Sequence, residues 1–293
     1  MKGLSNLKKQ ASDGLYRFFI YFTLSLIAVT VLVPIFWVIA ASLKSNHEFY
    51  ESPWKLPASL NFQNFADAWQ KADMGSYFGN SVLVTALSLV ILLVIAIPAA
   101  YALSRFQFKG RTAIKYVFMA GLFINVSYLV VPIFLMLVDI NALLGTQALL
   151  NSKPVLALVY ASTALPFTIY LLQGFFETIP KDYEEAAYVD GCSHFRTMVQ
   201  IMTPMARPAI ITVILFNFLS FWNEYIIAIT LMTDDSSKTL PVGLMNLMKA
   251  QNAQAQYGQM YAGLVIVMLP TLLLYIMVQK KLAEGLSIGG VKG

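Results

Sequence analysis

The stretch SVLVTALSLVILLVIAIPAAYALS, residues 81–104, decides the fold of this chain because it contains no charged side chain over its whole length. A helix crosses the hydrocarbon core of a bilayer with about 20 apolar residues, so this stretch is long enough to span a membrane. It is followed by RFQFKGR, residues 105–111, where cations appear without any acid. We therefore interpret residues 81–104 as a transmembrane helix with a basic loop directly after it.

The rest of the chain repeats this pattern. Its 293 residues are 58% hydrophobic and only 12% charged, whereas soluble domains carry about 25% charged residues. The sequence predicts an all-α polytopic membrane protein with six transmembrane helices, near 18–42, 80–103, 116–138, 154–175, 209–230 and 260–279. The first of these apolar stretches is too long for a signal peptide and is interpreted as an uncleaved anchor.

Lysine and arginine predict the orientation in the membrane. One side carries the basic loop 105–115 and most of the chain's 20 cations, while the other side carries only Lys44, Lys55, Lys71, Lys153, Lys238 and Lys249. The positive-inside rule makes the richer side cytoplasmic and places both termini there. This bias explains the net charge of +5 better than nucleic-acid binding does, because the cations are spread over loops.

The predicted organisation has three parts. Residues 1–15 form a cytoplasmic N-terminal segment, residues 16–283 form the six-helix transmembrane domain, and residues 284–293 form a cytoplasmic tail. The domain includes one long cytoplasmic loop, residues 177–208, between the fourth and fifth spans. The single Cys192 excludes a disulfide within the chain.

The long loop contains IPKDYEEAAYVDGCSHFRTMVQIMTPMARP, residues 179–208. Acidic residues occupy the first turns of a predicted helix, which is where the helix dipole favours them. Gly191 permits the left-handed conformation that ends a helix, and a second helix is expected over about 193–202, ended by Pro204. We expect a compact helix–glycine–helix knob with an apolar seam and with its carboxylates on the outer face. A solvated amphipathic loop is the plainer alternative.

The spacing within this loop resembles the EAA loop of permease subunits in binding-protein-dependent ABC importers. Glu185-Ala186-Ala187, Gly191, Ile201 and Pro204 stand at the positions of that pattern. Thr203 departs from it, because the family has leucine there. FGNSV (78–82), YALSRFQFKGR (101–111), FWNEYIIAIT (221–230) and GLSIGGVKG (285–293) extend the resemblance to the maltose-type carbohydrate permeases, and to the shorter six-helix partner among them.

The resemblance implies that the knob docks into a cleft on an ATPase subunit. The residues implied in this coupling are Glu184, Glu185, Ala186, Ala187, Asp190, Gly191, Ile201 and Pro204. The chain has no G-x-x-x-x-G-K-[ST] phosphate loop, so ATP and Mg are expected to bind the partner ATPase, with no cofactor or metal in this chain.

The implied complex sits in a bacterial or archaeal cytoplasmic membrane. Its other members are a second permease subunit that forms a heterodimer with this chain, two ATPase subunits and an extracytoplasmic sugar-binding protein. The implied function is import of a carbohydrate, an oligosaccharide or related sugar, by alternating access. The only partners expected besides these are membrane lipids.

Glu224 is the one formal charge inside a predicted span, and such residues are functional candidates. Asn217 and Ser220 share its helix face, and amides, hydroxyls and carboxylates match the hydroxyls of sugars. The candidate substrate-pathway residues are Asn217, Ser220, Trp222, Asn223 and Glu224. Two alternatives stay open: the polar groups hydrogen-bond to neighbouring helices, or Glu224 lies near enough to the interface to be hydrated.

The tail is flexible by composition, and the resemblance raises the alternative that it contacts the ATPase dimer through Gly285, Gly289, Gly290 and Lys292. Two other classes of protein compete with the importer subunit. A stand-alone secondary transporter or channel needs intramembrane ion sites, for which one Glu is thin support. An intramembrane enzyme needs catalytic groups within the spans, and no His or Asp lies there, so no catalytic residue is predicted.

Overall fold

The computed structural model describes residues 2–71, 73–254 and 256–290, and the regular structure in these ranges is helical. The helices long and apolar enough to cross a membrane are Tyr16–Ser42, Met74–Arg105, Val126–Leu144, Lys153–Thr178 and Tyr257–Gln279. A sixth span follows if His194–Met205 and Arg207–Trp222, bent by 76°, count as one. The predicted all-α polytopic class is confirmed.

The chain divides into two compact units, one of residues 1–71 and 247–266 and one of residues 72–246 and 267–293. The first contains α1 (Lys2–Ser42), α2 (Asn46–Glu51) and α3 (Gln63–Lys71), with the end of α13 (Leu240–Gln254) and the start of α14 (Tyr257–Gly290). Helix α1 begins at Lys2, so the predicted polar segment 1–15 continues directly into the first span.

The first unit is held by polar contacts just after α1. The buried Lys44 ammonium donates to the carbonyls of Ser52 and Pro53, at 3.0 and 2.9 Å, which satisfies a charge withdrawn from water. The Asn64 amide donates to the carbonyls of Ser42 and Lys44, both at 2.8 Å. A Cβ at Gly258 would lie 2.5 Å from that Asn64 amide nitrogen, so only glycine allows this approach.

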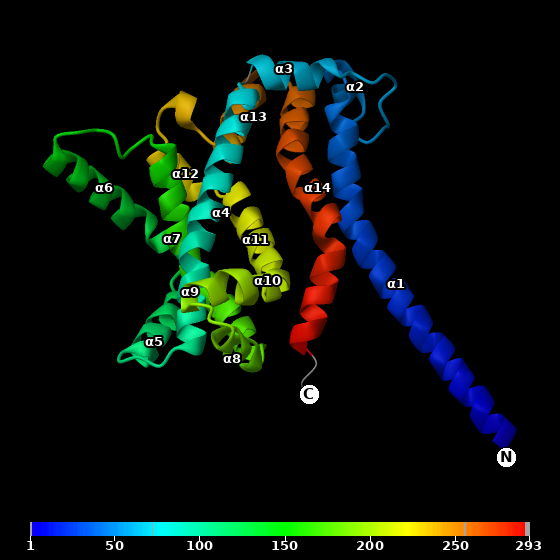
Figure 1. The fold of residues 1–293 in the computed structure, drawn as a ribbon. Coiled ribbons are helices and arrows are strands. Elements are labelled where there is room, and N and C mark those ends of the chain that lie inside the picture. Colours follow the sequence, from blue (N-terminus) through cyan, green and yellow to red (C-terminus); the bar gives the residue numbers. More distant parts are fainter. Residues whose placement is uncertain (1, 72, 255, 291–293) are drawn as a thin grey trace. The chain divides into compact units, whose positions relative to one another are not determined.

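The second unit is built on α4 (Met74–Arg105), α7 (Lys153–Thr178) and α11 (Arg207–Trp222), which Figure 1 draws in cyan, green and yellow. Helices α4 and α7 pack against each other more extensively than any other pair in the described residues. Small residues, among them Ala96 and Ala100 of α4 and Ala157 and Ala161 of α7, are fully buried there. Small side chains let apolar helices approach closely, which is how helices associate without a hydrophobic driving force in lipid.

The predicted third span, 116–138, covers two helices, α5 (Arg111–Gly121) and α6 (Val130–Leu144), with a 3₁₀ turn at Val126–Tyr128 between them. The Asn125 side chain accepts from the backbone N–H of Ser127 at 2.9 Å and so begins the turn. Asparagine competes with helical hydrogen bonding in this way. The residues of the turn carry no charge, so the absence of charged residues could not reveal the break.

The predicted fifth span, 209–230, is also divided, into α11 and the short α12 (Ile226–Leu231), with Asn223–Tyr225 between them. Before it, the predicted loop 177–208 holds α8 (Asp182–Val189), α9 (His194–Thr197), a π-helical turn at Met198–Met202 and α10 (Thr203–Met205). After it, a 3₁₀ turn at Asp235–Ser237 leads to α13. Helix α14 contains the predicted sixth span and continues through Gly290 into the predicted tail.

Candidate coupling loop and transport pocket

Glu184 of α8 points into the protein and is only 6% exposed. Its Oε1 accepts the Tyr101 hydroxyl at 2.6 Å, and its Oε2 lies 3.0 Å from Nε of Arg105. That last contact is an ion pair, although the Nε–H direction does not meet hydrogen-bond geometry. The prediction that the carboxylates of this loop lie on its outer face is therefore wrong for Glu184. Sequence reasoning missed the cause, a guanidinium at the end of α4 that burial would otherwise leave unpaired.

Gly191 ends α8 as predicted. Its φ is +79°, in the left-handed region, and its N–H donates to the carbonyl of Tyr188 at 3.0 Å. The N–H of Cys192 reaches back to the carbonyl of Ala187 at 2.9 Å. These two bonds form a Schellman motif, which satisfies the last carbonyls of the helix and reverses the chain.

The second helix of the knob differs from the expected one. Met198 and Met202 are buried, but Phe195 and Val199 are exposed, so the apolar seam is narrower than the sequence predicted. A π-helical turn widens the backbone over Met198–Met202, and the Thr203 hydroxyl donates to the Met198 carbonyl at 2.8 Å. Pro204 lies in α10, which continues directly from the π-helical turn and ends at Met205, one residue after the predicted stop.

The outward side of the loop combines acid and apolar groups. Glu185, Ala186 and Asp190 are exposed, while Ala187 is buried. Val189 is 88% exposed and Phe195 is 72% exposed. Of the two remaining pattern residues, Ile201 is half-buried and Pro204 is exposed. Apolar side chains this open beside carboxylates are the composition of a contact surface.

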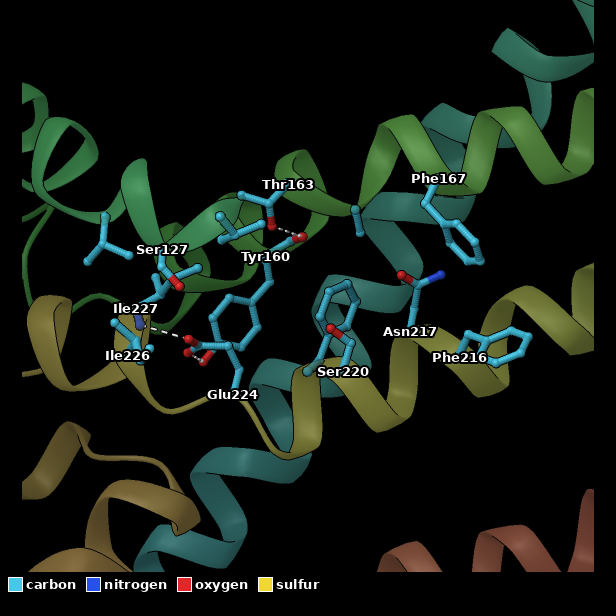
Figure 2. Close-up of a pocket in the computed structure, with 14 residues that line it drawn as sticks. Ser127, Tyr160, Thr163, Phe167, Phe216, Asn217, Ser220, Glu224, Ile226 and Ile227 are labelled. Carbon is cyan, nitrogen blue, oxygen red and sulfur yellow. Dashed lines mark hydrogen bonds between the residues drawn. The ribbon is translucent and has the colours of Figure 1, made fainter. Parts of the chain in front are cut away.

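A cavity of about 380 Å³ opens between α7, α11, α12 and the turn before α6. Figure 2 shows Asn217, Ser220 and Glu224 directed into it from α11 and the break after α11. The sequence therefore grouped these three residues on one face correctly. Apolar side chains, among them Phe167 and Phe216, supply much of the remaining wall.

Glu224 is held in the cavity wall by three donors. The Tyr160 hydroxyl donates to Oε2 at 2.7 Å, and the backbone N–H groups of Ile227 and Ala228 donate at 2.7 and 3.0 Å. The carboxylate thus caps the first turn of α12, where N–H groups lack helical partners. No cation lies within ion-pair distance of it among the described residues, so its charge is met by dipoles alone.

Asn217 has a divided role. Its amide nitrogen donates to the Thr168 hydroxyl at 3.1 Å and to the carbonyl of Val213 at 2.8 Å, which is the packing role left open by the sequence. Its oxygen accepts no hydrogen bond from a described residue, and the neighbouring Ser220 is exposed on the cavity side.

Trp222 and Asn223 do not line the cavity. The buried Trp222 donates from Nε1 to the carbonyl of Val267 at 3.1 Å and stacks on Phe218. Asn223 caps the end of α11 by donating to the carbonyl of Leu219 at 2.8 Å. The structure brings in Tyr160 and Thr163 of α7 and Ser127 instead. Tyr160 and Thr163 lie in a predicted span that carries no charge, so nothing in the sequence singled these two residues out.

In the tail, Gly285, Gly289 and Gly290 belong to α14, and Lys292 lies outside the described residues.

Residues 92–283, more than half of the chain, match the family described as the binding-protein-dependent transport system inner membrane component. The chain belongs to this family. It is a multi-pass protein of the cytoplasmic membrane and a transport component rather than an enzyme. In this family ATP is bound by a partner ATPase. The resemblance found from the EAA spacing is confirmed, and the family excludes the two alternatives, a stand-alone secondary transporter or channel and an intramembrane enzyme.

Two relatives cover nearly the whole chain. The diacetylchitobiose uptake system permease protein NgcG of Streptomyces coelicolor is 38% identical over 95% of this chain and 90% of its own length. The probable ABC transporter permease protein YurM of Bacillus subtilis is 36% identical over 92% and 87%. A solved bacterial ABC transporter that imports the acidic polysaccharide alginate has the same fold, with a TM-score of 0.78 at 24% identity over 92% of this chain and 97% of that chain.

Proposed function

We propose that this chain is the permease subunit of an ABC importer for a carbohydrate, an oligosaccharide or related sugar delivered by an extracytoplasmic binding protein. The observation that carries the proposal is the cavity at Glu224, which joins a carboxylate, an amide oxygen and hydroxyls to aromatic walls. Sugar hydroxyls need donors and acceptors together, and a few placed polar groups in an apolar pocket provide them. The diacetylchitobiose transported by NgcG belongs to this substrate class.

The complex that we propose contains a second permease chain and two ATPase subunits. The described residues contain at most six spans, and α1 exposes apolar side chains between Tyr16 and Ile39. Exposed apolar surface on a transmembrane helix is expected to face lipid or another membrane chain. ATP binding at the partners then changes the relative stability of inward-open and outward-open states, which is the only way that it can drive transport.

Transport through the cavity is tested by changing the size of the side chain at residue 220. Ser220→Trp fills the space beside Glu224 and is expected to lower sugar uptake at least tenfold, while Ser220→Ala is expected to stay within about twofold of wild type. Asn223→Ala is the matched control, because Asn223 is the next exposed polar residue but lies outside the cavity. Uptake of labelled diacetylchitobiose and of a monosaccharide is measured in proteoliposomes. Normal uptake of both sugars by Ser220→Trp would mean that the cavity is not part of the sugar pathway.

We also propose that the outward side of 177–208 docks on the ATPase. Its support is that Glu185 and the apolar Val189 and Phe195 of this loop are all exposed, since apolar anchors that become buried, with charges at the rim, are typical of protein contacts. Glu185→Arg is expected to abolish most of the binding-protein-stimulated ATP hydrolysis or to release the ATPase in pull-down experiments. Glu51→Arg, an exposed charge reversal in α2, is the control and is expected to change neither.

The tail is proposed to contact the same ATPase dimer through Gly285, Gly289, Gly290 and Lys292. Three glycines within six residues give a helix a thin surface that another backbone can approach. Removal of residues 284–293 is expected to reduce stimulated hydrolysis with sugar-loaded binding protein present. Unchanged stimulation at unchanged complex yield would make the tail dispensable.

A further inference from the structure

Three side chains join the proposed docking loop to the membrane spans. Tyr101 and Arg105 stand one turn apart at the end of α4, and both contact the carboxylate of Glu184 on α8, at 2.6 Å and 3.0 Å. We call these three residues the clasp. The side chains of Arg105 and Glu184 are 5% and 8% exposed, so the ion pair is shielded from water and salt.

Helix α8 depends on these contacts for its orientation. It has eight residues, and helices that short do not persist in water on their own. Its buried residues are Glu184 and Ala187, while Glu185 and Ala186 between them face outward. The same short helix therefore presents one carboxylate to the interior and the next to the exterior.

The clasp also reaches α7. The Arg105 guanidinium donates from Nη2 to the carbonyl of Ile179 at 2.7 Å, directly after α7 ends. Tyr101 packs edge-on against Phe176 of α7. The clasp therefore contacts both α4 and the end of α7, the two helices that share the main core of this unit.

We propose that Tyr101, Arg105 and Glu184 are positioning residues that transmit movement of the docked loop to α4 and α7. The inference rests on the docking proposed above and adds the route by which the movement enters the spans. An ion pair together with the directional hydrogen bond from Tyr101 fixes both the position and the rotation of α8, whereas an apolar contact resists sliding much less because it is not directional. Buried ion pairs add little net stability compared with apolar pairs. The contribution of the clasp is therefore to fix the orientation of α8.

Two variants test the clasp in the purified complex with ATPase subunits and binding protein loaded with diacetylchitobiose. Tyr101→Phe removes one hydroxyl and keeps the ring contacts with Phe106 and Phe176. We expect binding-protein-stimulated ATP hydrolysis to fall about tenfold, as for loss of one hydrogen bond to a charged group. The double variant Arg105→Met with Glu184→Leu replaces the ion pair by apolar groups. We expect wild-type assembly from it, and stimulation reduced by about tenfold or more.

Lys115→Met is the matched control. It removes a different ion pair of the same unit, Lys115–Glu177 at 3.0 Å, which joins α5 to α7. Stimulated hydrolysis in this control is expected to equal that of wild type. Wild-type stimulation in both clasp variants overturns the proposal. Loss of the ATPase subunits from both variants also overturns it, because the clasp is then only a folding contact of the loop.

The outcome is separable from that of the docking proposal. If Glu185→Arg leaves hydrolysis and ATPase binding unchanged, the docking fails and the clasp has no movement to transmit. If Glu185→Arg reduces stimulation while both clasp variants are normal, docking stands and transmission through the clasp fails.

Discussion

Glu184 and Glu224 are two carboxylates of the same unit, and each accepts a tyrosine hydroxyl, from Tyr101 at 2.6 Å and from Tyr160 at 2.7 Å. They differ in the other groups that contact the carboxylate. Glu184 is paired with the Arg105 guanidinium and buried, whereas Glu224 is met by two backbone N–H groups and borders a cavity. A cation cancels the field of its partner, but N–H dipoles leave a net charge that acts on the surroundings. The first carboxylate is therefore suited to anchoring and the second to meeting a polar substrate.

The largest effect is expected from removing the cation that pairs with Glu184. Arg105→Met leaves the Glu184 carboxylate buried without a counter-charge, and we expect a loss of about 3–5 kcal/mol. The check is the yield and thermal midpoint of the purified complex. Lys115→Met is the control, expected to cost under about 1 kcal/mol because that pair is partly exposed. A wild-type midpoint for Arg105→Met would mean that Glu184 does not depend on its cation.

The next effect concerns Glu224. Glu224→Ala removes the acceptor for the N–H groups of Ile227 and Ala228 and for the Tyr160 hydroxyl, with an expected cost of about 2–4 kcal/mol. Glu224→Gln keeps one acceptor oxygen and is expected to assemble better than Glu224→Ala while still transporting poorly. Thermal midpoints and sugar uptake are measured together. Full uptake by Glu224→Gln would mean that the carboxylate only caps α12 and has no role in transport.

A smaller effect is expected from removing the tyrosine hydroxyl that donates to each carboxylate. Tyr101→Phe and Tyr160→Phe each remove one hydroxyl donor, with an expected cost of about 1.5 kcal/mol. We expect the first to lower stimulated ATP hydrolysis, and the second to raise the sugar concentration needed for half-maximal uptake. Both quantities are measured for both variants. Identical profiles would contradict the assignment of separate roles.

The smallest effect is expected at Glu48 of α2, a carboxylate that neither forms a buried ion pair nor borders the cavity. Hydrogen bonds, foremost from the backbone N–H of Ser45, hold the pKa of Glu48 below its ordinary value of 4.5. A lowered pKa means that the ionised form stabilises the folded state, so this contribution is present above the ordinary value and is lost as the pH falls through the lowered one.

Glu48→Gln should therefore lower the thermal midpoint slightly at neutral pH. The two proteins should converge once the pH falls below the lowered pKa, because wild-type Glu48 is then protonated. The measurement is the midpoint difference between the two proteins from pH 7 downward. A difference that persists or grows on acidification would contradict the hydrogen-bonded capping box.

Apolar runs fixed most of the architecture in advance, because a bilayer demands long uncharged helices wherever the chain crosses it. The breaks within the third and fifth predicted spans could not be predicted in this way. Asn125 and Glu224 each turn the chain through side-chain bonds to backbone N–H groups, and composition remains apolar on both sides. Gly191 was predictable since its positive φ excludes most other residues.

Charge exclusion and the E-A-A…G spacing are local properties of the chain, so they were enough to predict the class of the protein, most of its long apolar helices and the turn at Gly191. The sequence also grouped Asn217, Ser220 and Glu224 correctly, since helical periodicity is local as well. Tertiary packing set which of Glu184 and Glu185 faces inward, and it brought the Tyr160 hydroxyl to Glu224 while it kept Trp222 out of the cavity wall. Those choices depend on residues more than 60 positions apart, and no local pattern records which distant donor reaches a carboxylate.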